Sequence, residues 1–188
     1  ILAMLGPSAG NIAKDLRETC LNDLNTMKIV DRLSSSGPIF DGRGLMFYRM
    51  HVGRHACMHD GIMAMLDEKE FANSVIKAME KENYPTVIRD YRVERMPVEL
   101  LNFIDEYYLR KEDTEIFLPG TILERLSGSD HIELPVDGTY RISWRGDSLS
   151  VNNMRPDNKG NMYLGKGEHE LETDGYAEDV TFILIERK

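Results

Sequence analysis

The chain has 188 residues, of which 41% are hydrophobic and 29% charged, and its mean hydropathy is −0.39. These values exclude a polytopic membrane protein, a collagen-like chain and a disordered tail. The 32 Asp and Glu residues outnumber the 23 Lys and Arg residues, and the resulting net charge of −9 argues against a broad nucleic-acid-binding face and against electrostatic binding to anionic lipid.

The first two thirds of the chain alternate helical and strand-like patterns. Apolar residues at helical spacing predict helices at residues 10–33, 56–66 and 68–82, and another that begins at Pro97. Short apolar runs at residues 39–40, 86–88 and 115–118 have strand character. Because helices separate these runs, we expect parallel pairing, and hence a small parallel-sheet α/β layer that forms a first domain over residues 1–126.

Each of these helices has an apolar face that we expect to be buried. In the first helix that face is a stripe made of Ile12, Leu16, Cys20, Leu24 and Met27. The expected inner face of the helix at 68–82 consists of Phe71, Val75, Ile76 and Met79. That of the helix after Pro97 consists of Val98, Leu101, Ile104 and Tyr108.

The pattern changes to strict alternation near residue 126. Residues 127–130, Ser-Gly-Ser-Asp, are typical of a linker-like turn, and apolar residues then occupy every second position in runs from Ile132 to Leu184. About six short strands joined by tight turns are expected, which predicts an antiparallel β-sandwich-like module over residues 127–188. Its aromatic residues are expected mainly in the core, with stacking on sugar rings as the alternative; they are Tyr140, Trp144, Tyr163 and Tyr176.

Polar residues follow two of the predicted strands. Asp41 and Arg43 lie in a Gly-rich turn after the first strand, Arg49 and His51 follow closely, and Asp90 comes just after the second strand. Strand ends of a parallel sheet form clefts, where Asp can accept hydrogen bonds from sugar hydroxyls and Arg can bind an anion. We therefore predict a ligand-binding cleft formed by these five residues. The alternative is a structural turn with solvated charges.

A second candidate site is formed by His51, His55 and His59, which are spaced four residues apart. On a continuous helix they would share a face and could bind zinc or copper. The alternative is that they are surface or packing residues. We single out no catalytic residue and expect no cofactor. The two cysteines, Cys20 and Cys57, permit either one disulfide or two free thiols.

Residues 37–51, GPIFDGRGLMFYRMH, resemble the soluble C-terminal region of bacterial multi-spanning membrane glycosyltransferases. These are the mannosyltransferase-like enzymes of the dolichyl-phosphate-mannose and aminoarabinose transferase type. Segments similar to those of this family follow in the same order at residues 84–90, 101–108 and 135–169, so the resemblance covers nearly the whole chain.

The resemblance implies an extracytoplasmic domain, periplasmic or at the cell surface, attached to a membrane in the full-length protein. In such enzymes the donor is a polyprenyl-phosphate sugar, and the catalytic carboxylates lie in loops between the membrane spans. We therefore expect this chain to be non-catalytic, to contact the membrane-embedded part of the same protein, and to help bind a glycan or protein acceptor. Residues 1–5 are expected at the junction with that part. A stand-alone carbohydrate- or protein-binding module and a small His-based metal-binding protein are the alternatives.

Overall fold

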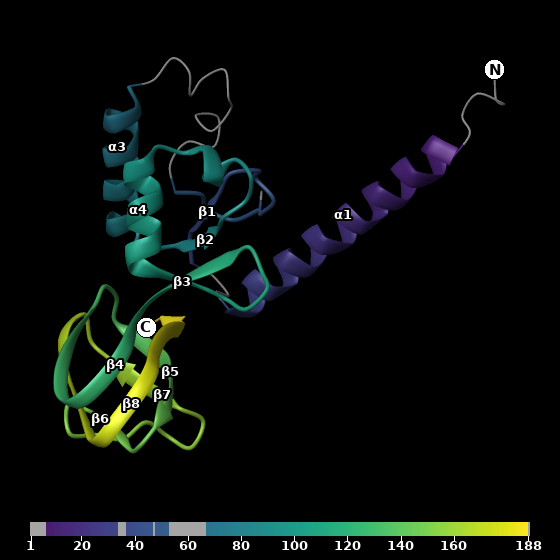
Figure 1. The fold of residues 1–188 in the computed structure, drawn as a ribbon. Helices are drawn as coiled ribbons and strands as arrows, with labels where there is room; N and C mark the ends of the chain where they lie inside the picture. The colour runs from purple at the N-terminus through teal and green to yellow at the C-terminus, as the bar shows by residue number, and fades with distance from the viewer. Residues whose placement is uncertain (1–6, 34–36, 47, 53–66, 188) are drawn as a thin grey trace, which may run out of the picture.

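The computed structural model describes residues 7–33, 37–46, 48–52 and 67–187 (Figure 1). Over these residues the fold is mixed α/β, with three α-helices and a mostly antiparallel sheet of eight strands. The helices are α1 (Pro7–Leu33), α3 (Glu68–Lys81) and α4 (Val98–Tyr107), with a 3-10 turn, η3 (Val93–Arg95), before α4. The strands are β1 (Ile39–Asp41), β2 (Thr86–Ile88), β3 (Tyr108–Arg110), β4 (Ile116–Leu134), β5 (Gly138–Gly146), β6 (Leu149–Val151), β7 (Asn161–Leu164) and β8 (Gly167–Arg187).

The expected parallel pairing is present for only two strands. β1 and β2 pair in parallel, with Phe40 opposite Val87, as predicted. The third predicted strand, β4, runs antiparallel to β2, so the prediction of parallel pairing is wrong there. The reason is β3, which follows α4 directly and turns back through residues 111–115 to pair antiparallel with β4. A crossover helix alone would bring the next strand back parallel to β2. Here β3 comes first and the chain then reverses again, so β4 runs antiparallel to β2.

Strand alternation divides the core around β1 and β2 between two clusters. Phe40 and Val87 belong to the larger apolar cluster, which contains α3 and α4. Ile39 and Ile88 point to the opposite face and pack with Val30 near the end of α1. Because successive side chains of a strand point to opposite faces, both faces of this part of the sheet are covered by helix.

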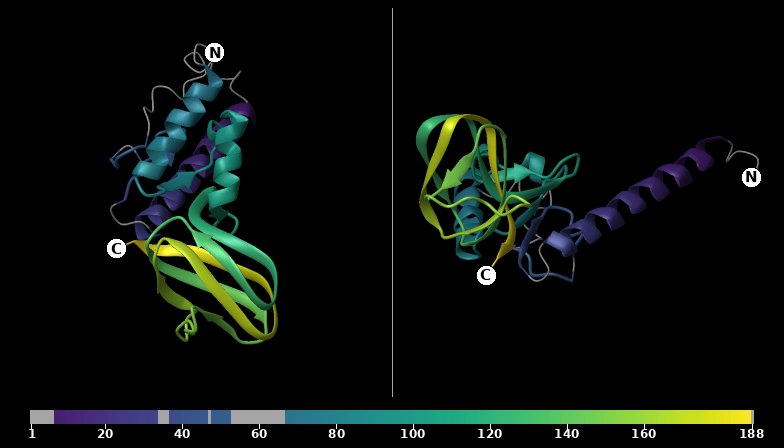
Figure 2. Two further views of the ribbon diagram at one scale, coloured as in Figure 1. Left: turned by 90° about the vertical axis from the view of Figure 1, so that its left-hand side faces the viewer. Right: turned by 90° about the horizontal axis from the view of Figure 1, so that it is seen from below.

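Helix α1 projects from the rest of the molecule, and only its C-terminal end packs on the body (Figures 1 and 2). The prediction of a buried stripe is therefore wrong for Cys20 and Leu24, which are exposed. Met27 is half-buried, and Val30 is fully buried. The side chains of Ile12 and Leu16 lie outside the described residues.

Helices α3 and α4 pack against each other (Figure 1). Asp67 caps α3 by accepting a hydrogen bond from the Glu70 backbone N–H. The predicted inner face of α4 is partly wrong, because Val98 is 61% exposed while Leu100 and Phe103 are buried. The remaining buried residues of these two helices are Ala72, Val75, Met79 and Ile104.

The segment at residues 127–130 is part of strand β4, so the prediction of a turn there is wrong. Gly128 has a positive φ of 75°, and the pairing register with β8 shifts between Ser127 and Ser129. β4 therefore continues through Gly128, and the two extra residues of the irregularity lie on β8, in the range 173–175. The predicted division between residues 126 and 127 falls inside β4, and the larger apolar cluster extends across it.

The alternating pattern of the C-terminal part is confirmed. Inward-facing Ile132, Tyr140, Ile142 and Phe182 are at most 7% exposed. The runs around residues 169–171 and 180–184, expected on separate strands, lie on the single long strand β8, which pairs with β4 at one edge and with β5 and β6 at the other. This part of the chain is a curved antiparallel sheet around an apolar core (Figure 2).

The four aromatic residues of this sheet have different environments. Tyr140 is fully buried and its hydroxyl donates to the Val136 carbonyl, whereas Trp144 packs partly on the core. Tyr163 and Tyr176 are about half exposed, at 48% and 49%, so the core prediction is wrong for these two. No helix in the described part of the chain is long and apolar enough to span a membrane.

Candidate functional site

The parallel pairing of β1 and β2 brings two predicted site residues, Asp41 and Asp90, to the same edge of the sheet. Both carboxylates are buried, with 0% and 1% of each residue exposed. The Asp41 carboxylate accepts backbone N–H bonds from Arg43 at 3.0 Å, Gly44 at 3.1 Å and Met46 at 2.9 Å. This carboxylate therefore holds the turn after β1 in its conformation.

Asp90 has the same kind of role in the turn after β2. Its Oδ1 accepts backbone N–H bonds from Arg92 at 2.8 Å and Val93 at 3.1 Å, and its Oδ2 accepts the Arg43 backbone N–H at 2.8 Å. Asp90 thus joins the two turns. Gly42 allows this approach, since a Cβ at that position would lie 2.5 Å from the Asp90 carboxylate. We call Asp41, Gly42, Arg43 and Asp90 the aspartate corner.

Arg43 connects the aspartate corner to α1 and to the start of β4. Its guanidinium lies 3.1 Å from the Asp23 carboxylate, 3.4 Å from Asp90 and 3.0 Å from Glu115. Arg43 also lines a groove of about 480 Å³ with Asn22 and other polar residues of α1. With three carboxylates around it, the Arg43 charge is already compensated within the protein.

The other predicted site residues lie apart from the aspartate corner. The Arg49 guanidinium pairs with Asp31 at 3.2 Å and donates to the Gly37 carbonyl at 2.6 Å. His51 Nε2 lies 3.2 Å from the Met46 carbonyl oxygen, and its backbone forms a bridge to Ile39. The structure therefore brings together Asp41, Arg43 and Asp90, whereas Arg49 and His51 contact the loop and helix beside β1.

The histidine prediction involves a part of the chain that lies outside the described residues. His55 and His59 are in the range 53–66, so their placement relative to His51 is not described. Among the residues that are described, no group of three His, Cys, Asp or Glu side chains could hold a metal ion. Cys57 is also outside this part, whereas Cys20 is an exposed free thiol on α1.

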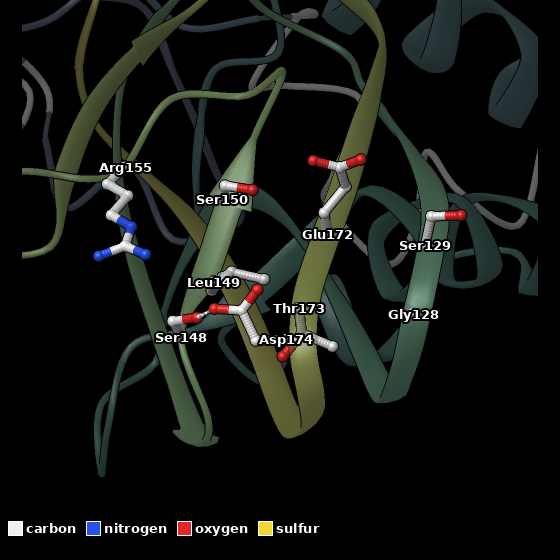
Figure 3. Close-up of a pocket in the computed structure, with 9 residues that line it drawn as sticks. All are labelled: Gly128, Ser129, Ser148, Leu149, Ser150, Arg155, Glu172, Thr173 and Asp174. Atoms are coloured by element: carbon white, nitrogen blue, oxygen red, sulfur yellow. Dashed lines mark hydrogen bonds between the residues drawn. The ribbon is translucent and has the colours of Figure 1, made fainter.

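Sequence reasoning did not find a polar pocket of about 400 Å³ in the curved antiparallel sheet (Figure 3). Strands β4, β6 and β8 and the loop after β6 contribute to it. We call it the serine pocket, and its lining residues are Gly128, Ser129, Ser148, Leu149, Ser150, Arg155, Glu172, Thr173 and Asp174.

A row of three polar residues crosses the serine pocket. Glu172 of β8 lies opposite Ser129 in the β4–β8 pair and opposite Ser150 in the β6–β8 pair. Residues directly opposite each other in antiparallel strands point to the same face, so the Glu172 carboxylate is flanked by two hydroxyl groups. Figure 3 shows Arg155 on the Ser150 side of this row, where its guanidinium supplies positive charge.

The remaining polar groups of the pocket are only partly satisfied within the protein. The Ser148 hydroxyl donates to the Asp174 carboxylate, as the dashed line in Figure 3 marks. The Thr173 hydroxyl oxygen is buried and has no hydrogen-bond partner among the described residues. Donors, acceptors and charges of both signs therefore meet in one concave surface. This lining is more polar than that of most small-molecule sites and suits a polar ligand.

Comparisons of the chain with protein-family models, with curated proteins and with solved structures return no match. Inferences about function therefore come from the geometry of the site and from the sequence resemblance described above.

Proposed function

We propose that this chain is a non-catalytic recognition domain that binds a hydroxyl-rich ligand, a glycan, in the serine pocket. The observation that carries the proposal is the row Ser129–Glu172–Ser150 with Arg155 beside it. Sugar hydroxyls both donate and accept hydrogen bonds. Serine hydroxyls match both roles, a carboxylate accepts, and a guanidinium donates.

The size of the pocket supports the same ligand class. A volume of about 400 Å³ lies within the roughly 300–1,000 Å³ of ordinary small-molecule sites. The pocket is predominantly polar, with Leu149 as its one large apolar residue in the described lining. A flat apolar cofactor would leave these polar groups without partners, whereas a sugar would pair with them.

We further propose that the domain works beside a membrane-embedded glycosyltransferase, on the outer side of the membrane. The support is the sequence resemblance, which implies a helix between the last membrane span and the soluble region. Helix α1 extends from the body in a way that suits such a connection (Figure 1). In this proposal α1 connects the rest of the α/β part at residues 1–126 to the membrane-embedded part. Residues 127–188, as a β-sandwich-like module, present the pocket to a glycan or to a glycosylated protein acceptor.

Glycan-array screening of the whole chain, followed by calorimetric titration of the best ligand, tests the recognition function. Replacement of Glu172 by Gln keeps the shape of the side chain and removes the charge, and we expect about a tenfold loss of affinity. Glu168→Gln is the matched control, because Glu168 is exposed on the same strand and does not line the pocket. Absence of millimolar binding, or equal binding by the two variants, would contradict the proposal.

A further inference from the structure

A second cavity, of about 570 Å³, lies where the end of α1, the end of α3 and the C-terminal end of β8 meet. We call it the junction pocket. Its apolar lining residues are Leu33, Pro38, Leu118, Pro119, Leu184 and Ile185. Its charged lining residues are Arg32, Glu82, Glu186 and Arg187. The junction pocket shares no residue with the serine pocket or with the aspartate corner.

Arg187 is the unusual residue of this pocket. Its side chain is partly buried, and one guanidinium nitrogen donates to the Tyr84 backbone carbonyl. Burial lowers the pKa of Arg187, and the nearby positive charge of Arg49 lowers it further. Desolvation of a charge is costly unless an opposite charge or several hydrogen bonds compensate it.

No carboxylate in the described part of the chain forms an ion pair with Arg187 within 4 Å. Four arginines there pair with carboxylates within 4 Å, namely Arg43, Arg49, Arg89 and Arg145, whereas Arg187 has no such partner among the described residues. A guanidinium has five N–H donors. The Tyr84 carbonyl is the only acceptor within hydrogen-bond distance of Arg187 among these residues.

The surroundings of Arg187 also favour an anion. Arg32 is an exposed second cation on the same cavity. Glu82 and Glu186 line the pocket too, and Glu186 is exposed to solvent. Solvent screens the exposed Glu186 carboxylate more than the partly buried Arg187 guanidinium, whereas Glu82 is itself partly buried. The two glutamates therefore limit the ligand to low charge.

We propose that the junction pocket binds a small organic oxyanion, a carboxylate or a phosphate monoester, whose charged group pairs with Arg187 and whose apolar portion packs on Leu33, Pro38 and Ile185, the partly exposed apolar residues of the lining. A planar guanidinium can donate two parallel hydrogen bonds to either group. These apolar residues add affinity in proportion to the apolar surface that is removed from water. Such a ligand would connect α1, α3 and β8, and would therefore stabilise the whole molecule.

The test uses the full chain and four probes: hexyl phosphate, hexanoate, inorganic phosphate and the neutral analogue hexanol. At about a hundredfold excess over Kd, we expect a saturating anion to raise Tm by about 5–10 °C. Hexyl phosphate and hexanoate should bind, inorganic phosphate should bind more weakly, and hexanol should not bind. No saturation below about 10 mM, or equal binding of hexanol, would overturn the proposal.

Variants locate the charged contact. Arg187→Gln is expected to weaken hexyl phosphate binding at least tenfold, and Arg187→Lys to weaken it less, because the charge remains while the paired donors are lost. Arg145→Gln removes an arginine that is 73% exposed and serves as the control. If Arg187→Gln does not fold, Arg187→Lys and Arg32→Gln carry the test. Wild-type affinity in both would overturn the proposal.

Vesicles distinguish the two sources of such an anion. We expect a free ligand, because a net charge of −9 opposes approach to an anionic bilayer. Hexyl phosphate should therefore bind while vesicles that contain phosphatidic acid do not. Vesicle binding that depends on Arg187 would assign the same pocket to a lipid headgroup. Failure of these experiments would leave the glycan titration of the serine pocket unaffected, since the two cavities are separate.

Discussion

The aspartate corner and the serine pocket both contain carboxylates among polar neighbours, but the hydrogen-bonding groups of the two regions have different partners. In the corner, the buried carboxylates of Asp41 and Asp90 each accept three backbone N–H bonds, so their hydrogen-bonding capacity is used inside the protein. In the pocket, Glu172 is flanked by serine hydroxyls at a surface that is open to solvent. A polar cluster is therefore a better candidate for binding when its groups still have capacity for an external partner.

The largest effect is expected from Asp90→Ala. The substitution would leave the Arg92 and Val93 N–H groups without an acceptor, and the Arg43 N–H would keep only Asp41. It would also remove one partner of the Arg43 guanidinium. We expect a loss of about 3–5 kcal/mol in the free energy of unfolding, measured by urea denaturation. A loss below about 1 kcal/mol would show that the aspartate corner is not needed for stability. The contrast between a structural aspartate corner and a ligand-binding serine pocket would then fail.

Gly42→Ala tests the same corner through its geometry. The added methyl group would lie 2.5 Å from the Asp90 carboxylate and 2.9 Å from the Arg92 Cβ, so the two turns would have to move apart. A cost of about 1–3 kcal/mol is expected from such overpacking. Gly165→Ala is the control, since its Cβ would meet only the Asp137 carboxylate, at 3.7 Å. Similar urea midpoints for the two variants would argue against a tight corner.

The comparison also shows which parts of the molecule could be predicted from the sequence. Placing Asp41 and Asp90 at one edge of the sheet required only the recognition of two apolar runs that would pair in parallel, and β1 and β2 do so. Whether a carboxylate binds a ligand or its own backbone depends on the path of the turn. That path is set by Gly42 and η3 together, and no spacing rule describes it.

The serine pocket could not be predicted for a related reason. Ser129, Ser150 and Glu172 come from three strands, and they meet because the register of β4 on β8 shifts between Ser127 and Ser129. The Gly-Ser sequence at this shift predicts a turn, whereas the strand continues through it. Alternation identified the buried positions, because burial depends on local periodicity, whereas pairing between distant strands depends on the whole fold.

Glu172→Gln is expected to change binding and not stability, which separates the two regions most clearly. The residue is on a strand surface, and the amide keeps its shape, so the free energy of unfolding should stay within about 0.5 kcal/mol of the wild type. Affinity for the glycan should fall about tenfold, equivalent to about 1.4 kcal/mol. A loss of stability above about 1.5 kcal/mol would mean that Glu172, like Asp90, has a structural role.

The smallest effect is expected from Glu115→Gln at the outer side of the corner. Glu115 pairs with Arg43 at 3.0 Å, but its side chain is 49% exposed, and Asp23 and Asp90 remain beside the guanidinium after the substitution. Exposed ion pairs contribute about 0–1 kcal/mol and weaken as salt is added. We therefore expect a loss below about 1 kcal/mol at low salt that disappears near 1 M NaCl. If the loss instead matched that of Asp90→Ala at both salt concentrations, charge pairing of Arg43 would stabilise the corner more than the backbone hydrogen bonds do.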